Sequence, residues 1–171
     1  PAHNLFAQLE RYIMENKFQI ESIGTIQRDD DLYAIQVDHK FAPALKSIEG
    51  FSHLQIVWWA HLTDSPVERD TLVIDKLFKK GPDSMGVFAT RSPFRPNPIL
   101  ISTIKVQQID FEEGVIYTPF IDAEENTPVL DIKPYFSMER VKDCQNPAWC
   151  QHWPQWFEDT MAFDWSDEMV R

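Results

Sequence analysis

Short apolar runs separated by turn residues dominate the chain after Phe18, which is the pattern of β-strands. The sequence predicts strands over Ile20–Ile26, Leu32–Val37, Leu54–Trp59, Gly86–Ala89, Ile99–Val106 and Val115–Ile121. Many short strands with few helices are typical of a closed antiparallel barrel. We therefore predict a mainly β fold, a closed antiparallel β-barrel of about six or seven strands.

Helical spacing is confined to short segments. An amphipathic helix is predicted over Asn4–Lys17, where Leu5, Leu9, Tyr12 and Ile13 recur every three or four positions. One helical turn is predicted over Ala42–Ile48, and Val67–Phe78 is predicted as a helix or a long arm. The chain is thus divided into an N-terminal helical arm (1–17), a barrel domain (18–136) and a C-terminal extension (137–171).

The C-terminal extension is acidic and rich in tryptophan. Trp149, Trp153 and Trp156 share helical spacing, so one face of a short helix is predicted to carry all three. Two roles stay open for these rings. They cap the barrel or form a subunit contact, or they form a stacking platform for a nucleobase.

The formal net charge of −11 over 171 residues excludes a protein that binds nucleic acid with its whole surface. Basic residues are nevertheless concentrated in one stretch: Lys76, Lys79, Lys80, Arg91 and Arg95. Such a patch can bind a phosphate or a nucleic-acid loop. For the three lysines the simpler interpretation is the solvated face of a helix.

Other features of the sequence narrow the class of protein. Only two cysteines are present, so no disulfide framework is predicted. No apolar run is long enough to span a bilayer, and the first residues lack a signal-peptide pattern, so we expect a cytoplasmic protein with no membrane contact. The histidines and cysteines do not form a convincing metal-ligand set, so no metal is expected.

The segment Gly86–Ile99 carries the strongest chemical signal. Three prolines within six residues rule out a helix or a central strand there and favour extended backbone. A stiff loop is therefore predicted to hold Arg91, Arg95 and Asn97 in fixed directions. Loops that display arginine and asparagine in this way usually hold an anionic or planar polar ligand.

This segment closely resembles the signature of the TsaA/TrmO family, β-barrel methyltransferases that use S-adenosyl-L-methionine. A second block, Asp122–Tyr135, resembles the family's second signature, and Ile48–Leu54 followed by His61 resembles a third. The blocks occur in family order over roughly residues 18–136. The chain has no glycine-rich strand-to-helix turn, so its cofactor site is expected in loops at the barrel rim.

The resemblance implies specific site residues. Those implied to bind the cofactor are His61, Leu62, Arg91, Ile101, Asp122, Ala123, Glu124 and Glu125. Acidic residues favour the cationic sulfonium, and an adenine needs apolar walls. Those expected to bind the substrate are Arg95, Asn97, Lys133 and Tyr135. Asp131 and Lys133 form either a structural ion pair or a substrate contact. No catalytic base is assigned, because the cofactor supplies the activated methyl group.

The chain departs from the family in four places. A loop that carries Pro-Arg-Gln in family members is replaced by Asp29–Asp31, and Leu100 stands where a glycine is usual. Asn126 also replaces a glycine, but asparagine tolerates left-handed backbone, so that turn is expected to survive. An acidic extension stands in place of the C-terminal domain of longer members.

Three functions follow, in order of preference. The first is a methyltransferase that acts on the threonylcarbamoyl-modified adenosine next to the anticodon of tRNA, with the basic patch on the anticodon-loop phosphates. The second is a methyltransferase for a small-molecule acceptor, which the acidic charge favours. The third is a non-catalytic barrel that binds S-adenosyl-L-methionine or a nucleotide. A homodimer is expected from the resemblance.

Overall fold

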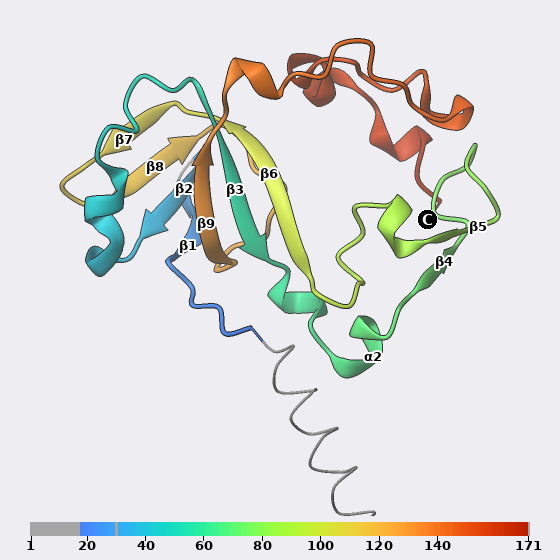
Figure 1. The fold of residues 1–171 in the computed structure, drawn as a ribbon, viewed down its shortest axis with the longest axis horizontal. Helices are drawn as coiled ribbons and strands as arrows, with labels where there is room; N and C mark the ends of the chain where they lie inside the picture. Colours follow the sequence, from blue (N-terminus) through green and yellow to red (C-terminus); the bar gives the residue numbers. More distant parts are fainter. Residues whose placement is uncertain (1–17, 30, 171) are drawn as a thin grey trace, which may run out of the picture.

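The computed structural model describes residues 18–29 and 31–170, whose longest regular elements are antiparallel strands (Figure 1). The strands are β1 (Gly24–Asp29), β2 (Leu32–Val37), β3 (His53–Trp59), β4 (Val73–Asp75), β5 (Ser84–Gly86), β6 (Ile99–Lys105), β7 (Gln108–Asp110), β8 (Val115–Thr118) and β9 (Pro128–Pro134). The predicted helix over Asn4–Lys17 lies outside the described residues.

Within these described ranges the helices are few and short. They are η1 (His39–Leu45), η2 (His61–Thr63), α2 (Pro66–Arg69), η3 (Val87–Ala89), η4 (Ser137–Glu139), η5 (Ala148–Cys150), η6 (Phe157–Ala162) and η7 (Trp165–Asp167), of which only α2 is α-helical. The predicted turn over Ala42–Ile48 corresponds to η1. Of the segment predicted as a helix or a long arm, only the first residues are helical, and the rest forms an arm with β4 and β5.

The main sheet has seven strands in the order β6-β3-β9-β1-β2-β8-β7, and all its pairings are antiparallel. The predicted closed barrel is wrong, because β6 and β7 occupy opposite edges and do not pair. They are consecutive in the chain, and the backbone changes partner between them: Val106 donates to the Ser52 carbonyl, and Gln107 donates to the Tyr117 carbonyl. One bent segment therefore serves both edges, and the sheet remains open.

The core lies on one face of this curled sheet. Alternation places Leu54, Ile56 and Trp58 of β3 on the buried side, where they meet aliphatic residues of the other strands. Gly24 begins β1 where a Cβ would lie 2.1 Å from the Gln36 carbonyl oxygen, so the close approach of β1 and β2 requires glycine. The opposite face of β3, β6 and β9 carries more exposed side chains, among them Ile101.

The arm and the C-terminal extension form a second packed region beside the sheet. In Figure 1 the extension leaves β9, passes over the ends of β3 and β6 and reaches the arm. Phe78 of the arm stacks on Trp149 at 5.1 Å and meets Trp153 edge-on at 5.0 Å. The single helix predicted for Trp149, Trp153 and Trp156 is wrong, since this segment contains only short 3-10 turns. Pro154 interrupts any longer helix there.

Candidate functional site

The turn between β8 and β9 is the acidic element of the site. Its backbone is anchored to β1: Asn126 donates to the Ile26 carbonyl (2.7 Å), and Ile26 donates to the Thr127 carbonyl (2.9 Å). Asn126 has φ +63°, so the left-handed conformation expected of the usual glycine is retained. The predicted cofactor residues of this turn are Asp122, Ala123, Glu124 and Glu125, and only Ala123 among them is not exposed.

The turn η2 meets the acidic turn at the same end of the sheet. His61 Nδ1 lies 3.5 Å from the hydroxyl of Thr127, which is 1% exposed. Leu62 is 67% exposed and presents apolar surface beside it. Thr127 was not singled out as a site residue from the sequence, although it belongs to the second signature block.

The start of β6 adjoins η2. Ala60 donates to the Pro98 carbonyl at 2.8 Å, and Ile99 pairs with Trp59. Two positions further along β6, Ile101 lies opposite Val57 and is 49% exposed. Three elements of the predicted cofactor site, from distant parts of the sequence, are thus placed by β3, β6 and β9.

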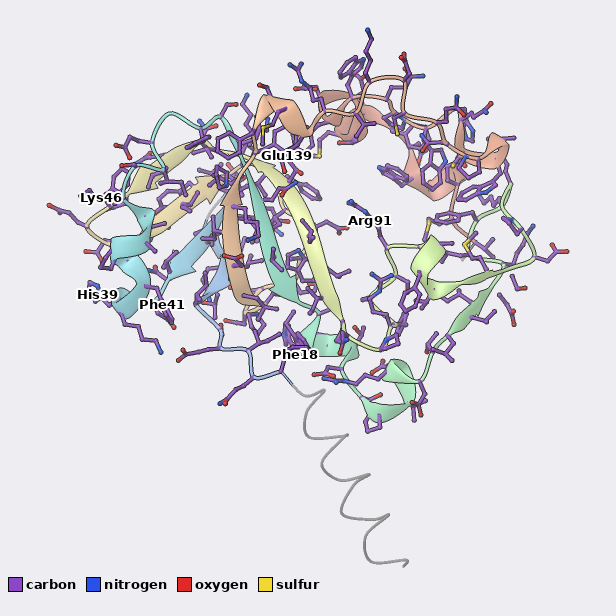
Figure 2. The ribbon with its side chains drawn as sticks, viewed as in Figure 1. Phe18, His39, Phe41, Lys46, Arg91 and Glu139 are labelled. Carbon is purple, nitrogen blue, oxygen red and sulfur yellow. The ribbon has the colours of Figure 1, made fainter. Side chains whose placement is uncertain are left out.

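Arg91 lies on a separate loop, between η3 and β6. Figure 2 shows its side chain pointing from this loop toward the side on which the sheet lies. The loop is held by Arg95, whose Nη2 donates to the carbonyls of Val87 (3.0 Å) and Thr90 (2.8 Å). Arg95 Nε is buried without a hydrogen-bond partner among the described residues. Asn97, the other predicted substrate residue of this loop, is exposed.

The remaining predicted substrate residues lie elsewhere on the sheet. Lys133 of β9 forms an ion pair with Asp131 (2.5 Å), and this hydrogen bond raises the pKa of Lys133. Both side chains are about half exposed, so the pair stands on the surface of the strand. Tyr135 follows the far end of β9, where its amide donates to the His53 carbonyl (3.1 Å). The structure therefore does not bring Tyr135 together with the residues at the Pro128 end of β9.

The three arm lysines do not lie on a helix, and each contacts another part of the chain, although Lys79 and Lys80 remain exposed. Lys76 Nζ donates to the Gly81 carbonyl (2.9 Å), and Lys79 Nζ donates to the Ser166 carbonyl (3.0 Å). Lys80 Nζ lies 3.1 Å from the carboxylate of Glu168, a residue that is 4% exposed.

Glu168 is the ionic centre of the contact between arm and extension. Its carboxylate receives hydrogen bonds from His152 Nε2 (2.7 Å) and Trp153 Nε1 (3.1 Å) as well as from Lys80. The hydrogen bond from His152, followed by those from Trp153 and Lys80, lowers the pKa of Glu168 to about 2 against the opposing effect of burial. Nothing in the sequence distinguishes this residue from the other acidic residues of the C-terminal extension.

A further polar cluster, also missed from the sequence, borders η2. The Asp64 carboxylate accepts a hydrogen bond from Trp59 Nε1 (2.8 Å) and another from Arg69 Nε. The hydrogen bond from Arg69, with that from Trp59, lowers the pKa of Asp64. The capping box of Ser65 and Glu68, visible in the sequence as Ser-x-x-Glu, was the signal that α2 begins here.

Two expected departures from the family are visible. β1 and β2 pair up to Asp29 and Leu32, so only two residues separate them and no room remains for the longer loop. Leu100 lies within β6 in ordinary extended conformation and packs partly against the core. Within 18–29 and 31–170, no three histidine, cysteine or acidic side chains are close enough to hold a metal ion.

The same described ranges contain no helix that could cross a membrane. Membrane contact was not expected from the sequence.

Comparison with known proteins confirms the resemblance found in the sequence. The model of the tRNA-methyltransferase O N-terminal domain matches residues 15–139. A probable S-adenosyl-L-methionine-binding protein of Pyrococcus horikoshii is 36% identical over 116 residues, which are 68% of this chain and 81% of that protein.

Two further relatives are longer than this chain. A tRNA (adenine(37)-N6)-methyltransferase of Escherichia coli is 40% identical over an alignment of 139 positions that covers 70% of this chain and 58% of that protein. The crystal structure of TrmO from Pseudomonas aeruginosa has a similar fold, with a TM-score of 0.58 and 24% identity over 77% of this chain and 62% of that chain. The chain thus spans about three fifths of each.

Proposed function

The chain belongs to the tRNA-methyltransferase O family, and on that premise we propose that it is an S-adenosyl-L-methionine-dependent methyltransferase. One observation carries the proposal. Two segments of the family signature, which are far apart in the sequence, meet at one end of the sheet through His61 and Thr127. The meeting places apolar surface and exposed carboxylates side by side, as a cationic cofactor with an adenine requires.

The residues present fit the cofactor chemically. Leu62 and Ile101 offer exposed apolar surface to an adenine. The exposed carboxylates of the turn 122–125 favour a positive charge. The guanidinium of Arg91 suits the carboxylate of the methionine moiety, because arginine pairs with carboxylates in two-pronged geometry. When bound, the cofactor supplies a methyl group that its sulfonium already activates.

The substrate we propose is tRNA, with the methyl acceptor the threonylcarbamoyl-modified adenosine beside the anticodon. The name of the Escherichia coli relative supports this choice. Asn97, Lys133 and Tyr135 are proposed to contact the substrate, and Arg95 acts by holding the loop that carries Arg91 and Asn97. The chain's task is then to align the acceptor nitrogen behind the methyl group and to exclude water.

A small-molecule acceptor is the second candidate. The observation that favours it is that Lys76, Lys79 and Lys80 are engaged within the chain, which leaves them less available for RNA phosphates. The net charge of −11 acts in the same direction.

A homodimer is also proposed, together with the domain limits 1–17, 18–136 and 137–171 and a cytoplasmic location. The support for a dimer is apolar surface on the arm. Leu72, Val73 and Phe88 are 62%, 60% and 82% exposed, and Val87 donates to the Leu72 carbonyl, so these residues are neighbours. An apolar patch of this kind is typical of a protein interface.

Calorimetric titration with S-adenosyl-L-methionine tests the proposal. We expect the wild-type protein to bind, and Arg91→Ala to bind at least about tenfold more weakly, since hydrogen bonds to charged groups are strong. Arg140→Ala is the control, because it removes another exposed arginine, the residue that follows η4 in the C-terminal extension. Wild-type protein that does not bind the cofactor would overturn the proposal. The acceptor is then identified by mass spectrometry of unmethylated tRNA and of small nucleosides after incubation with the cofactor.

A further inference from the structure

Three side chains close a ring around η2. Asp64, just after η2, accepts hydrogen bonds from Trp59 at the end of β3 and from Arg69 at the end of α2. The Arg69 guanidinium also lies over the Trp59 ring, 5.2 Å from its centre. The ring thus joins the residues on both sides of the turn Ala60–Thr63, which carries His61 and Leu62.

The turn has little else to fix it. Its own bonds are those from the amide and hydroxyl of Thr63 to the Ala60 carbonyl, both 3.1 Å. Its polar contacts with other elements are the hydrogen bond from the Ala60 amide to the Pro98 carbonyl and the 3.5 Å approach of His61 to Thr127, and of its residues only Ala60 is buried in the core. A 3-10 segment of three residues has weak hydrogen-bond geometry and does not hold its shape alone.

The ring is poorly suited to a purely stabilising role. The side chains of Asp64 and Arg69 are 25% and 40% exposed, and partly exposed ion pairs contribute little to global stability. The pair is neutral as a whole, so it does not attract the cofactor's cation by net charge. The planar guanidinium of Arg69 stacks on the Trp59 ring and bonds to the Asp64 carboxylate, so the orientation of these three side chains is restricted.

We propose that Asp64 and Arg69 are positioning residues for the cofactor site, acting through the turn that presents His61 and Leu62. The inference rests on the proposed function and names residues beyond the family signature. Trp59, at the end of β3, contributes to the same ring: its indole N–H orients the Asp64 carboxylate, and its aromatic ring packs against the Arg69 guanidinium. Loss of either charged partner leaves the turn free to move without unfolding the sheet.

The test is cofactor affinity in Asp64→Asn and Arg69→Gln, measured by calorimetry with S-adenosyl-L-methionine. We expect Kd to rise roughly tenfold in both variants. In metal sites, removing a residue that orients a ligand weakens binding by about ten- to a hundredfold, and this is the lower end of that range. Trp59→Phe keeps a ring under the guanidinium but loses the indole N–H, so a smaller rise is expected. Arg69→Lys retains the charge but not the planar geometry, and should restore only part of the affinity.

A second readout separates positioning from folding. Thermal midpoints should stay near that of the wild type, and the variants should raise KM for the cofactor while leaving kcat nearly unchanged at saturation. Lys40→Ala is the matched control, because Lys40 also forms an exposed ion pair, with Glu21, and also lies over an aromatic ring, Phe41. It belongs to η1, across the sheet from η2 (Figure 1).

The possible results distinguish failure of the positioning role from failure of the proposed function. If wild-type protein binds the cofactor and both charged-pair variants bind equally well, the positioning role is overturned and the proposed function stands. If both variants and Lys40→Ala weaken binding alike, the effect is a general one and the role is again overturned. If the wild type does not bind at all, the proposed function itself fails.

Discussion

The sheet and the arm–extension region are stabilised by different chemistry. The sheet buries aliphatic side chains from most of its strands, and Ile26, Ile35, Leu54, Ile56, Ile104 and Ile116 are all fully buried. The arm and extension instead meet through aromatic rings around Phe78 and one buried carboxylate, Glu168. The first arrangement is insensitive to pH and strongly cooperative, whereas the second depends on a few contacts and on one charge.

This difference bears on function. The acidic turn and η2 belong to the sheet, so their relative position is set by the ladder of β3, β9 and β1. Arg91 follows the arm and is connected to the sheet through the loop to β6. A change in the arm–extension contact is therefore expected to move Arg91 while leaving His61, Leu62 and the turn 122–125 in place.

The largest effect should come from the aliphatic core. Ile56 is fully buried in the centre of β3, so Ile56→Ala creates a cavity and should lower the free energy of unfolding by about 2–5 kcal/mol. Urea denaturation followed by far-UV circular dichroism measures this change. Because the sheet is one cooperative unit, cofactor binding should be lost at the same urea concentration at which the sheet unfolds, and not at a lower one.

Phe78→Ala is the comparison variant in the other region. It removes the ring that contacts both Trp149 and Trp153, so hydrogen exchange should accelerate in residues 77–80 and 149–170. The strands of the main sheet should keep their protection. Equal acceleration in both regions would show that the two are a single cooperative unit and would contradict the comparison.

The charge at Glu168 provides the second prediction. Its pKa is lowered from 4.5 to about 2, chiefly by the hydrogen bond from His152, so the ionised carboxylate stabilises the folded contact above pH 4.5. This stabilisation is lost as the pH falls from 4.5 toward 2. The near-UV circular dichroism of the tryptophan cluster should decrease over that interval, before the far-UV signal of the sheet.

Glu168→Gln should already show the weaker near-UV signal at pH 7 and should lose most of the acid transition. Asp167→Asn changes the net charge by the same amount at an exposed neighbouring position, so it should titrate like the wild type. An unaltered acid transition in Glu168→Gln would assign the pH dependence to another group.

The sequence predicted the sheet better than the arm–extension region, for physical reasons. Short apolar runs identified β2, β3 and β6, because each of these strands contributes buried aliphatic side chains to the core. β9 is not among these runs, because prolines bound it and Asp131 and Lys133 interrupt it, although the alternation of these two residues with Leu130 and Ile132 indicated a strand. Closure was wrongly predicted because a bend at Val106 and Gln107 leaves no signature in a local pattern. The contact between Phe78 and Trp149 also could not be predicted from a local pattern, because the two residues are far apart in the sequence.

The candidate site divides in the same way. The family signature indicated His61, Leu62 and the turn 122–125, and β3 and β9 do place these residues at one end of the sheet. Whether they bind the cofactor stays a prediction. The ring of Trp59, Asp64 and Arg69 could not be foreseen, because it depends on the direction in which α2 leaves η2.

The smallest predicted effect concerns the acidic turn, and it asks how rigidly the sheet presents its part of the site. Asn126 has φ +63°, a conformation that costs alanine about 1 kcal/mol more than glycine, so Asn126→Ala should destabilise the turn by that much more than Asn126→Gly does. Both variants lose the hydrogen bond from Gln27 Nε2 to the Asn126 side chain (3.2 Å), so their difference isolates the backbone. Calorimetry with S-adenosyl-L-methionine should show weaker binding for the alanine variant alone. Equal affinity in the two variants would mean that cofactor binding does not depend on the backbone conformation of this turn. The sheet would then hold its part of the site no more rigidly than the arm holds Arg91.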